Sequence, residues 1–70
     1  MNAAVKNAII EQLDSIDSKL YPNISEKIKF NAGKELVVNS IYNKLIKFPK
    51  WDINNCLSDI EINFNGLGNE

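Results

Sequence analysis

The sequence contains no histidine, no arginine and no threonine, and its only cysteine is Cys56. A single cysteine excludes a disulfide within the chain, whereas small secreted domains are usually rich in disulfides. We therefore expect the protein to reside in the reducing cytoplasm. Structural zinc sites are built from histidine and cysteine side chains, so we expect no metal ion and, in the absence of any cofactor motif, no cofactor.

Side chains suited to catalysis near neutral pH are also scarce. General acid–base catalysis most often uses histidine, which this chain lacks. Cys56 lies beside Leu57 on the flank of an apolar stripe, with no histidine or arginine to activate it, which predicts a buried structural thiol. Lys34 follows Gly33, but the segment lacks the remaining residues of a phosphate-binding loop. We predict that the protein is not an enzyme and has neither catalytic residues nor a small-molecule substrate.

No apolar run approaches the ~18–20 residues that a membrane span requires, and the N-terminal pattern is not that of a signal peptide. We expect one helical domain over residues 1–70, without membrane association. A domain this small buries only about 60% of the surface of its unfolded chain. Its core rarely supplies more than about 3–5 kcal/mol, and neither a disulfide nor zinc adds to it here, so we expect self-association or a protein partner.

Pro22 and Pro49 divide the chain into three segments, and apolar side chains recur at helical spacing in each. The stripe of the first segment consists of Val5, Ile9, Leu13, Ile16 and Leu20. The wider apolar face of the middle segment consists of Val37, Val38, Ile41, Tyr42, Leu45, Ile46 and Phe48. The stripe of the last segment consists of Ile53, Leu57, Ile60 and Phe64. Asp52 is the expected N-cap of the last helix, and Asn65 and Gly66 its expected end.

The central helix is expected to be interrupted near residues 31–33. Extending it backward would place Lys27 and Lys34 on its apolar face, and an interior Gly33 would cost about 1 kcal/mol. Asn23 and Glu26 have the spacing of a capping box, which predicts a short preceding helix. These patterns predict an all-α fold, a small three-helix bundle with a kinked or broken central helix.

An α+β fold with short strands near 27–30 and 60–64 is the alternative. Ile60, Ile62 and Phe64 alternate with polar residues, as they would on a half-buried strand. The helix explains more of the last segment, because it accounts for four apolar positions and for both ends.

Charge is distributed unevenly along the chain. The net charge is −2 over residues 1–26, +5 over residues 27–50 and −4 over residues 51–70. One interpretation is that these segments neutralise one another across the bundle, through surface ion pairs worth less than about 1 kcal/mol each.

The other interpretation is a positive patch formed by Lys44, Lys47 and Lys50 next to Trp51. Such a patch is suited to phosphate contacts, but base-edge readout relies chiefly on arginine, and the chain has none. Acidic residues of the last helix would also face an anionic groove. These features favour protein over nucleic acid as the partner.

The predicted bundle leaves Ile10, Phe30, Leu36, Trp51 and Ile62 outside its core. Several such residues in one place would form an association surface. Tryptophan is enriched among interface hot spots, although Trp51 also fits a cap over the open end of the bundle. The predicted partner-binding residues are Leu36, Lys44, Lys47, Lys50, Trp51 and Ile62.

These observations favour a small non-enzymatic interaction or regulatory protein that binds and modulates a protein partner, and that forms a homodimer. One alternative is a nucleic-acid-associated regulator that uses the basic patch at residues 44–50. Another is a minor structural subunit of a larger assembly. The heavy use of asparagine, isoleucine and lysine without arginine is typical of A/T-rich genomes, which favours a bacterial or phage accessory protein.

Overall fold

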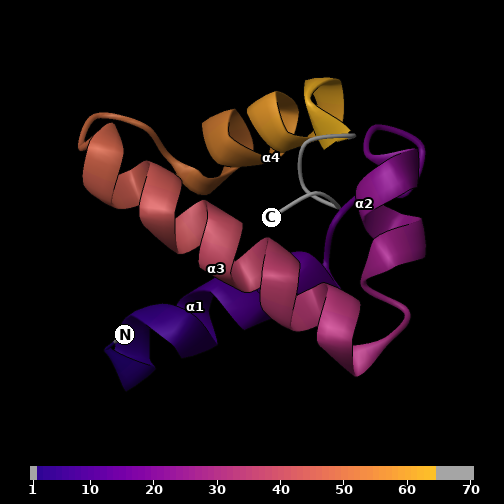
Figure 1. Ribbon diagram of the computed structural model, residues 1–70, viewed down its shortest axis with the longest axis horizontal. Helices are drawn as coiled ribbons and strands as arrows, with labels where there is room; N and C mark the ends of the chain where they lie inside the picture. Colours follow the sequence, from indigo (N-terminus) through magenta and orange to yellow (C-terminus); the bar gives the residue numbers. More distant parts are fainter. Residues whose placement is uncertain (1, 65–70) are drawn as a thin grey trace.

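The structure, a computed structural model, describes residues 2–64, which form four helices (Figure 1). They are α1 (Ala3–Asp14), α2 (Pro22–Lys27), α3 (Asn31–Lys47) and α4 (Ile53–Ile62). The all-α fold is thereby confirmed. No strand occurs within residues 2–64, so the alternative with strands near 27–30 and 60–64 is wrong. None of the four helices has the length and apolar character needed to cross a membrane.

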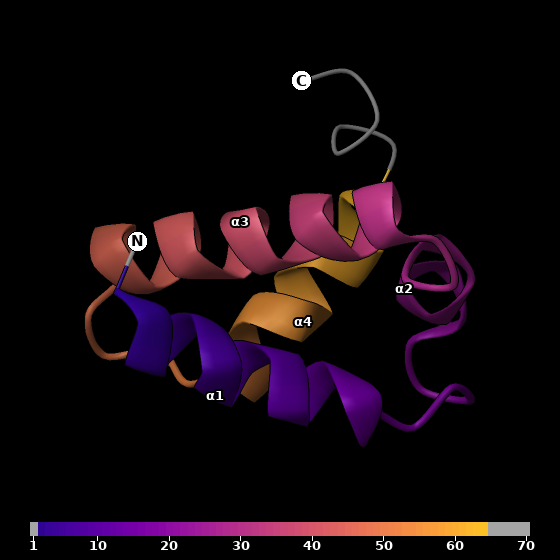
Figure 2. The ribbon, with the colours of Figure 1, turned by 90° about the horizontal axis from the view of Figure 1, so that it is seen from below.

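The helices pack as a bundle around α3. α1 and α4 each contact α3, and α2 contacts both α3 and α4. Figure 2 shows α2 at the end of the bundle where α1 finishes and α3 begins. Together, α2 and α3 are the predicted central helix, broken into two pieces, with α1 and α4 as its two neighbours.

The core draws on all four helices. Its buried side chains are Ile9, Leu13, Ile24, Val37, Val38, Ile41, Cys56, Leu57 and Ile60. All nine are apolar, and no charged side chain of the described segment is buried, although the hydroxyl oxygen of the half-buried Ser25 is covered. The core therefore depends on apolar contact rather than on buried ion pairs. Most of its members belong to the predicted helical stripes, but Ile46, predicted on the apolar face of the central helix, is 62% exposed and does not reach the core.

The first helix is shorter than predicted. α1 ends at Asp14, and the carboxylate of Asp17 accepts a hydrogen bond of 2.8 Å from the backbone N–H of Lys19. Aspartate and serine favour such local bonds over helix, and the segment after Asp14 is rich in both. Ile16 still packs against the core, but Leu20 is exposed. The predicted extension of the apolar stripe of the first helix to Leu20 is therefore wrong.

The break in the central helix is confirmed, but it lies at residues 28–30, just before the predicted position at 31–33. Gly33 is buried within the first turn of α3. A Cβ at this position would lie 2.0 Å from the carbonyl oxygen of Lys27, the last residue of α2. Glycine is required here by the close approach of two backbones, and its own backbone angles are ordinary.

The N-terminus of α2 is capped from α4 and not from its own sequence. The two carboxylate oxygens of Glu61 accept hydrogen bonds from the backbone N–H groups of Asn23 (3.0 Å) and Ile24 (3.1 Å). Pro22, which has no N–H, occupies the first turn beside them. The predicted capping box of Asn23 and Glu26 is therefore wrong, and Glu26 pairs instead with a lysine that follows α2.

The start of α4 is as predicted. The carboxylate of Asp52 accepts from the backbone N–H of Asn55 at 2.8 Å, and the Asn55 side chain accepts from the N–H of Asp52 at 3.1 Å. This reciprocal pair is a capping box. At the other end Asn63 is the C-cap, while the predicted end at Asn65 and Gly66 lies outside the described residues.

Candidate functional site

A tight turn joins α3 to α4. The backbone N–H of Trp51 donates to the carbonyl oxygen of Phe48 at 2.9 Å, which closes a β-turn with Pro49 at its second position. Proline favours this position because its φ angle is already fixed. The turn brings together the side chains of its first and fourth residues, and the rings of Phe48 and Trp51 stack with centroids 4.2 Å apart and planes 19° apart.

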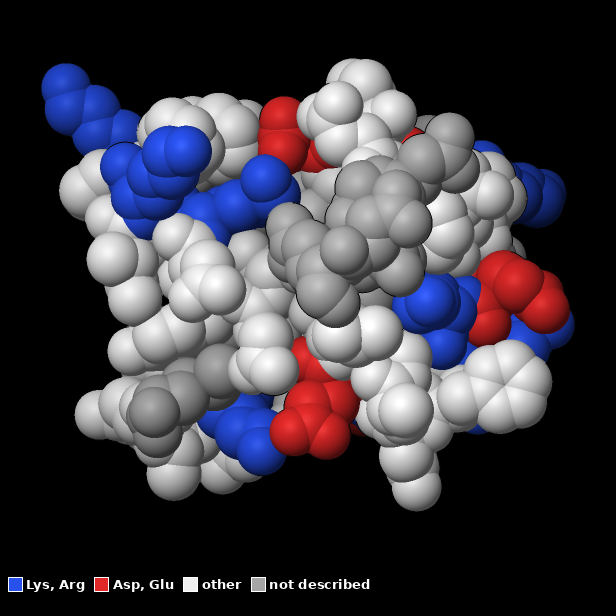
Figure 3. All heavy atoms as spheres, in the orientation of Figure 1, with Lys and Arg blue, Asp and Glu red and all other residues white. Residues whose placement is uncertain are grey.

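The turn borders a surface hollow of about 380 Å³, which we call the connector hollow. Its lining residues are Lys47, Phe48, Pro49, Lys50 and Trp51. The Lys47 ammonium lies 5.5 Å from the centroid of the Phe48 ring, within the range of a cation–π contact. Figure 3 shows lysine side chains gathered over the end of the molecule where α3 passes into α4. The hollow therefore combines an aromatic lining with two cations.

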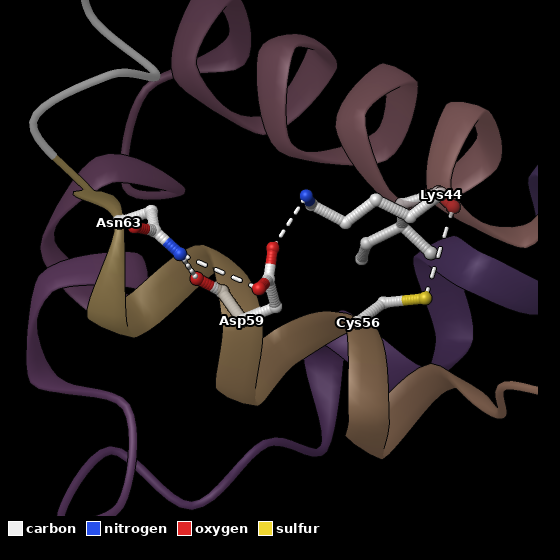
Figure 4. A network of polar contacts seen from close by, with 5 residues as sticks. Lys44, Cys56, Asp59 and Asn63 are labelled. Carbon is white, nitrogen blue, oxygen red and sulfur yellow. Dashed lines mark hydrogen bonds and ion pairs between the residues drawn. The ribbon is translucent and has the colours of Figure 1, made fainter. Parts of the chain in front are cut away.

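Lys44 is placed differently from the other two lysines of the predicted patch. Its ammonium forms an ion pair with the Asp59 carboxylate of α4 (Figure 4). The side-chain amide of Asn63 donates to the same carboxylate at 3.3 Å. The charge of Lys44 is thus neutralised within the α3–α4 contact, and Lys44 does not line the connector hollow.

Ion pairs join the basic middle of the chain to its acidic ends. Lys34 of α3 pairs with Asp14 of α1 at 2.8 Å, and Lys44 of α3 pairs with Asp59 of α4. Both pairs are partly exposed, so each stabilises the fold by less than about 1 kcal/mol. Within residues 2–64, Lys47 and Lys50 form no ion pair. At the α3–α4 end, Lys47 and Lys50 are therefore the lysines of the basic segment whose charges no carboxylate of the described chain neutralises.

The remaining predicted partner-binding residues lie away from the connector hollow. Leu36 of α3 is 37% exposed and Ile62 of α4 is 82% exposed. Trp51 lines the hollow and also packs against the core, and Ile10 packs against the core as well. The core contact of Trp51 agrees with the predicted alternative in which Trp51 caps the end of the bundle. Ile10 is not left outside the core, contrary to the prediction, because the α1–α3 contact covers one side of it.

Cys56 is a structural residue, as predicted. It is buried, and its Sγ lies 4.0 Å from the carbonyl oxygen of Ile41, to which the thiol donates a weak hydrogen bond (Figure 4). Burial raises the pKa of the Cys56 thiol, and this effect outweighs the opposing effect of the Lys44 ammonium. A protonated, buried thiol is a poor nucleophile. In the described part of the chain, no three side chains of metal-binding type come together.

Two residues of the hollow, Phe48 and Pro49, are missed by the sequence-based prediction. The sequence pattern assigns Phe48 to the apolar face of the central helix. In the structure α3 ends one residue before Phe48, and the Phe48 ring stacks on Trp51. The signal that would have found both is a proline at the second position of a turn with aromatic residues at its first and fourth positions.

The chain matches no protein-family model, no curated protein and no solved structure. The connector hollow, with the charges and apolar side chains around it, is therefore the feature of the molecule that indicates a function.

Proposed function

We propose that the chain is a small non-enzymatic interaction protein that binds a protein partner through the connector hollow and modulates it. The observation that carries this proposal is the hollow itself, which is lined by Lys47 and Lys50 together with the stacked rings of Phe48 and Trp51. Aromatic side chains in concave, well-packed surroundings are the usual centres of protein–protein interfaces. The ordered β-turn limits the entropy lost when a partner binds.

Position-dependent cross-linking tests this proposal. A photoreactive residue replaces the exposed Lys50 in the hollow, and in a control chain it replaces the exposed Lys19 between α1 and α2. In cells of the native host we expect a discrete protein adduct from position 50, suppressed by an excess of unlabelled chain, and none from position 19. The same adducts from both positions, or none from position 50, would contradict the proposal.

We also propose that the chain forms a homodimer in the cytoplasm. Large apolar side chains remain on the surface after the core has closed, among them Leu20, Phe30, Ile46 and Ile62. A small core supported by neither a disulfide nor a zinc site gains stability from burying such side chains against a second copy. Sedimentation velocity tests this part, and a strict monomer across the micromolar range would refute it.

A nucleic-acid-associated regulator is the second candidate, because Lys47 and Lys50 lie beside two aromatic rings. This candidate is weaker, since Asp59 neutralises Lys44 and the chain contains no arginine. Labelled single-stranded DNA and RNA would test it at low and moderate salt. A contact driven by phosphate must weaken steeply as salt rises.

A further inference from the structure

We infer that the occupant of the connector hollow is an acidic protein segment that carries one large apolar side chain between its carboxylates. This inference rests on the proposed function and specifies the chemistry of the partner. It follows from three properties of the hollow: the charges of its lysines, its apolar lining and the extent to which other side chains already cover its aromatic rings.

The rim of the hollow is positive. Lys47 and Lys50 pair with no carboxylate of the described chain, whereas Lys44 pairs with Asp59. Asp52 is the nearest acidic residue in the sequence, and its carboxylate accepts from the backbone N–H of Asn55 at the start of α4. Two ammonium groups beside one carboxylate leave the local charge positive. This charge complements an anionic partner, and carboxylates are the anions that proteins carry.

The rest of the hollow's lining is apolar. Phe48, Pro49 and Trp51 provide it, and the volume of about 380 Å³ is at the small end of the range of ligand pockets. A hollow of this size has room for at least one large apolar side chain. Lys47 precedes Phe48 and Pro49 in the chain and Lys50 follows them, so the segment that we infer carries acidic residues on both sides of its apolar residue.

The aromatic faces favour a protein segment over a nucleic acid. Nucleobases stack on open ring faces. One face of the Phe48 ring is covered by Trp51, the Lys47 ammonium lies over the same ring, and Trp51 also packs against the core. Two lysines without arginine also provide few phosphate contacts. An apolar side chain needs only contact with ring edges and with proline, which the hollow offers.

Trp51 is the only tryptophan of the chain, so its fluorescence reports on the hollow without any label. The probe is a blocked peptide with a central phenylalanine and two glutamates on each side. Its controls are the same peptide with serine at the centre, the same peptide with lysines as flanks, and a ten-residue oligothymidine. We expect the acidic phenylalanine peptide to bind at least about tenfold more tightly than either peptide control, and binding to weaken as salt rises.

Matched charge variants test the role of the rim. We expect the double variant Lys47→Gln with Lys50→Gln to weaken peptide binding about three- to tenfold, the effect of losing two exposed ion pairs. The control, Lys6→Gln with Lys19→Gln, removes two exposed lysines outside the hollow and should leave binding unchanged.

Three results would overturn the inference: equal binding of the lysine-flanked or serine-centred peptide, tighter binding of oligothymidine than of the acidic peptide, or an equal loss in both double variants. Failure of the acidic peptide together with a position-specific adduct at position 50 would refute the acidic chemistry and leave the proposed function standing. Absence of that adduct would refute the proposed function as well.

Discussion

The two ends of α3 are built in different ways. At its N-terminal end, α2 and α3 meet through a close backbone contact at Gly33, and Glu61 of the distant helix α4 caps α2. At its C-terminal end, a β-turn of neighbouring residues stacks Phe48 on Trp51 and leaves Lys47 and Lys50 without ion-pair partners in the described chain. The contacts at the first end serve the fold, while the second end keeps two lysines without ion pairs in the described chain, as the proposed binding role requires.

Gly33→Ala is expected to have the largest effect. Helix propensity alone would stabilise the variant by about 1 kcal/mol, because alanine is the better helix former. The added Cβ would instead lie 2.0 Å from the Lys27 carbonyl oxygen, so the backbone must shift. We expect a net loss of about 1–3 kcal/mol in the free energy of unfolding, the usual cost of overpacking. Urea denaturation followed by circular dichroism measures it.

The control for Gly33→Ala is Asn43→Ala, an exposed position of the same helix. It should change the free energy of unfolding by no more than about 0.5 kcal/mol. A Gly33→Ala variant that is more stable than the parent chain would show that helix propensity prevails and that the close approach is not rigid.

Glu61→Ala removes the cap supplied from α4. The N–H groups of Asn23 and Ile24 then lose their acceptor, and water replaces it only in part because Ile24 is buried. We expect a loss of about 0.5–2 kcal/mol, the range measured for helix caps. Hydrogen exchange should accelerate first at the amides of α2. The control Glu11→Ala removes an exposed carboxylate of α1, and an equal loss there would contradict a specific cap.

Phe48→Leu tests the other end of α3. The stack on Trp51 should contribute about 0.5–1.5 kcal/mol beyond the area that it buries. We expect a loss within this range, together with a red shift of Trp51 fluorescence as its ring becomes more exposed. Unchanged emission would show that the core contacts of Trp51 hold its ring in place without Phe48.

The same contrast explains how much of the fold the sequence predicts. Asp52 and Asn55 cap α4 from adjacent turns, and Val37, Val38 and Ile41 reach the core at helical spacing, so local patterns suffice for both. Glu61 caps α2 by accepting from the Ile24 N–H, and these two residues are 37 positions apart in the sequence. No local pattern contains that bond, because it depends on how α2 and α4 pack.

In the candidate site too, features that depend on neighbours in the sequence are predicted, and features that depend on helix packing are not. Trp51, Lys47 and Lys50 come together because they are neighbours in the sequence, and their grouping is predicted. The ion pair between Lys44 and Asp59 is not predicted, because it depends on how α3 and α4 are positioned relative to each other along their contact. Helix boundaries are the remaining difficulty: one residue decides whether Phe48 belongs to the face of α3 or to the turn.

Lys50→Gln is expected to have the smallest effect on stability. Lys50 lies beyond α3, is exposed and pairs with no acid of the described segment, so the free energy of unfolding should change by less than about 0.5 kcal/mol. Lys47→Gln should cost slightly more, about 0.3–1 kcal/mol, because Lys47 lies in the last turn of α3 and interacts with the helix dipole. Urea denaturation of both variants, beside peptide titrations followed by Trp51 fluorescence, separates folding from binding. A loss from Lys50→Gln as large as that from Gly33→Ala would show that both ends of α3 serve the fold alike, since a side chain free to bind a partner contributes little to stability.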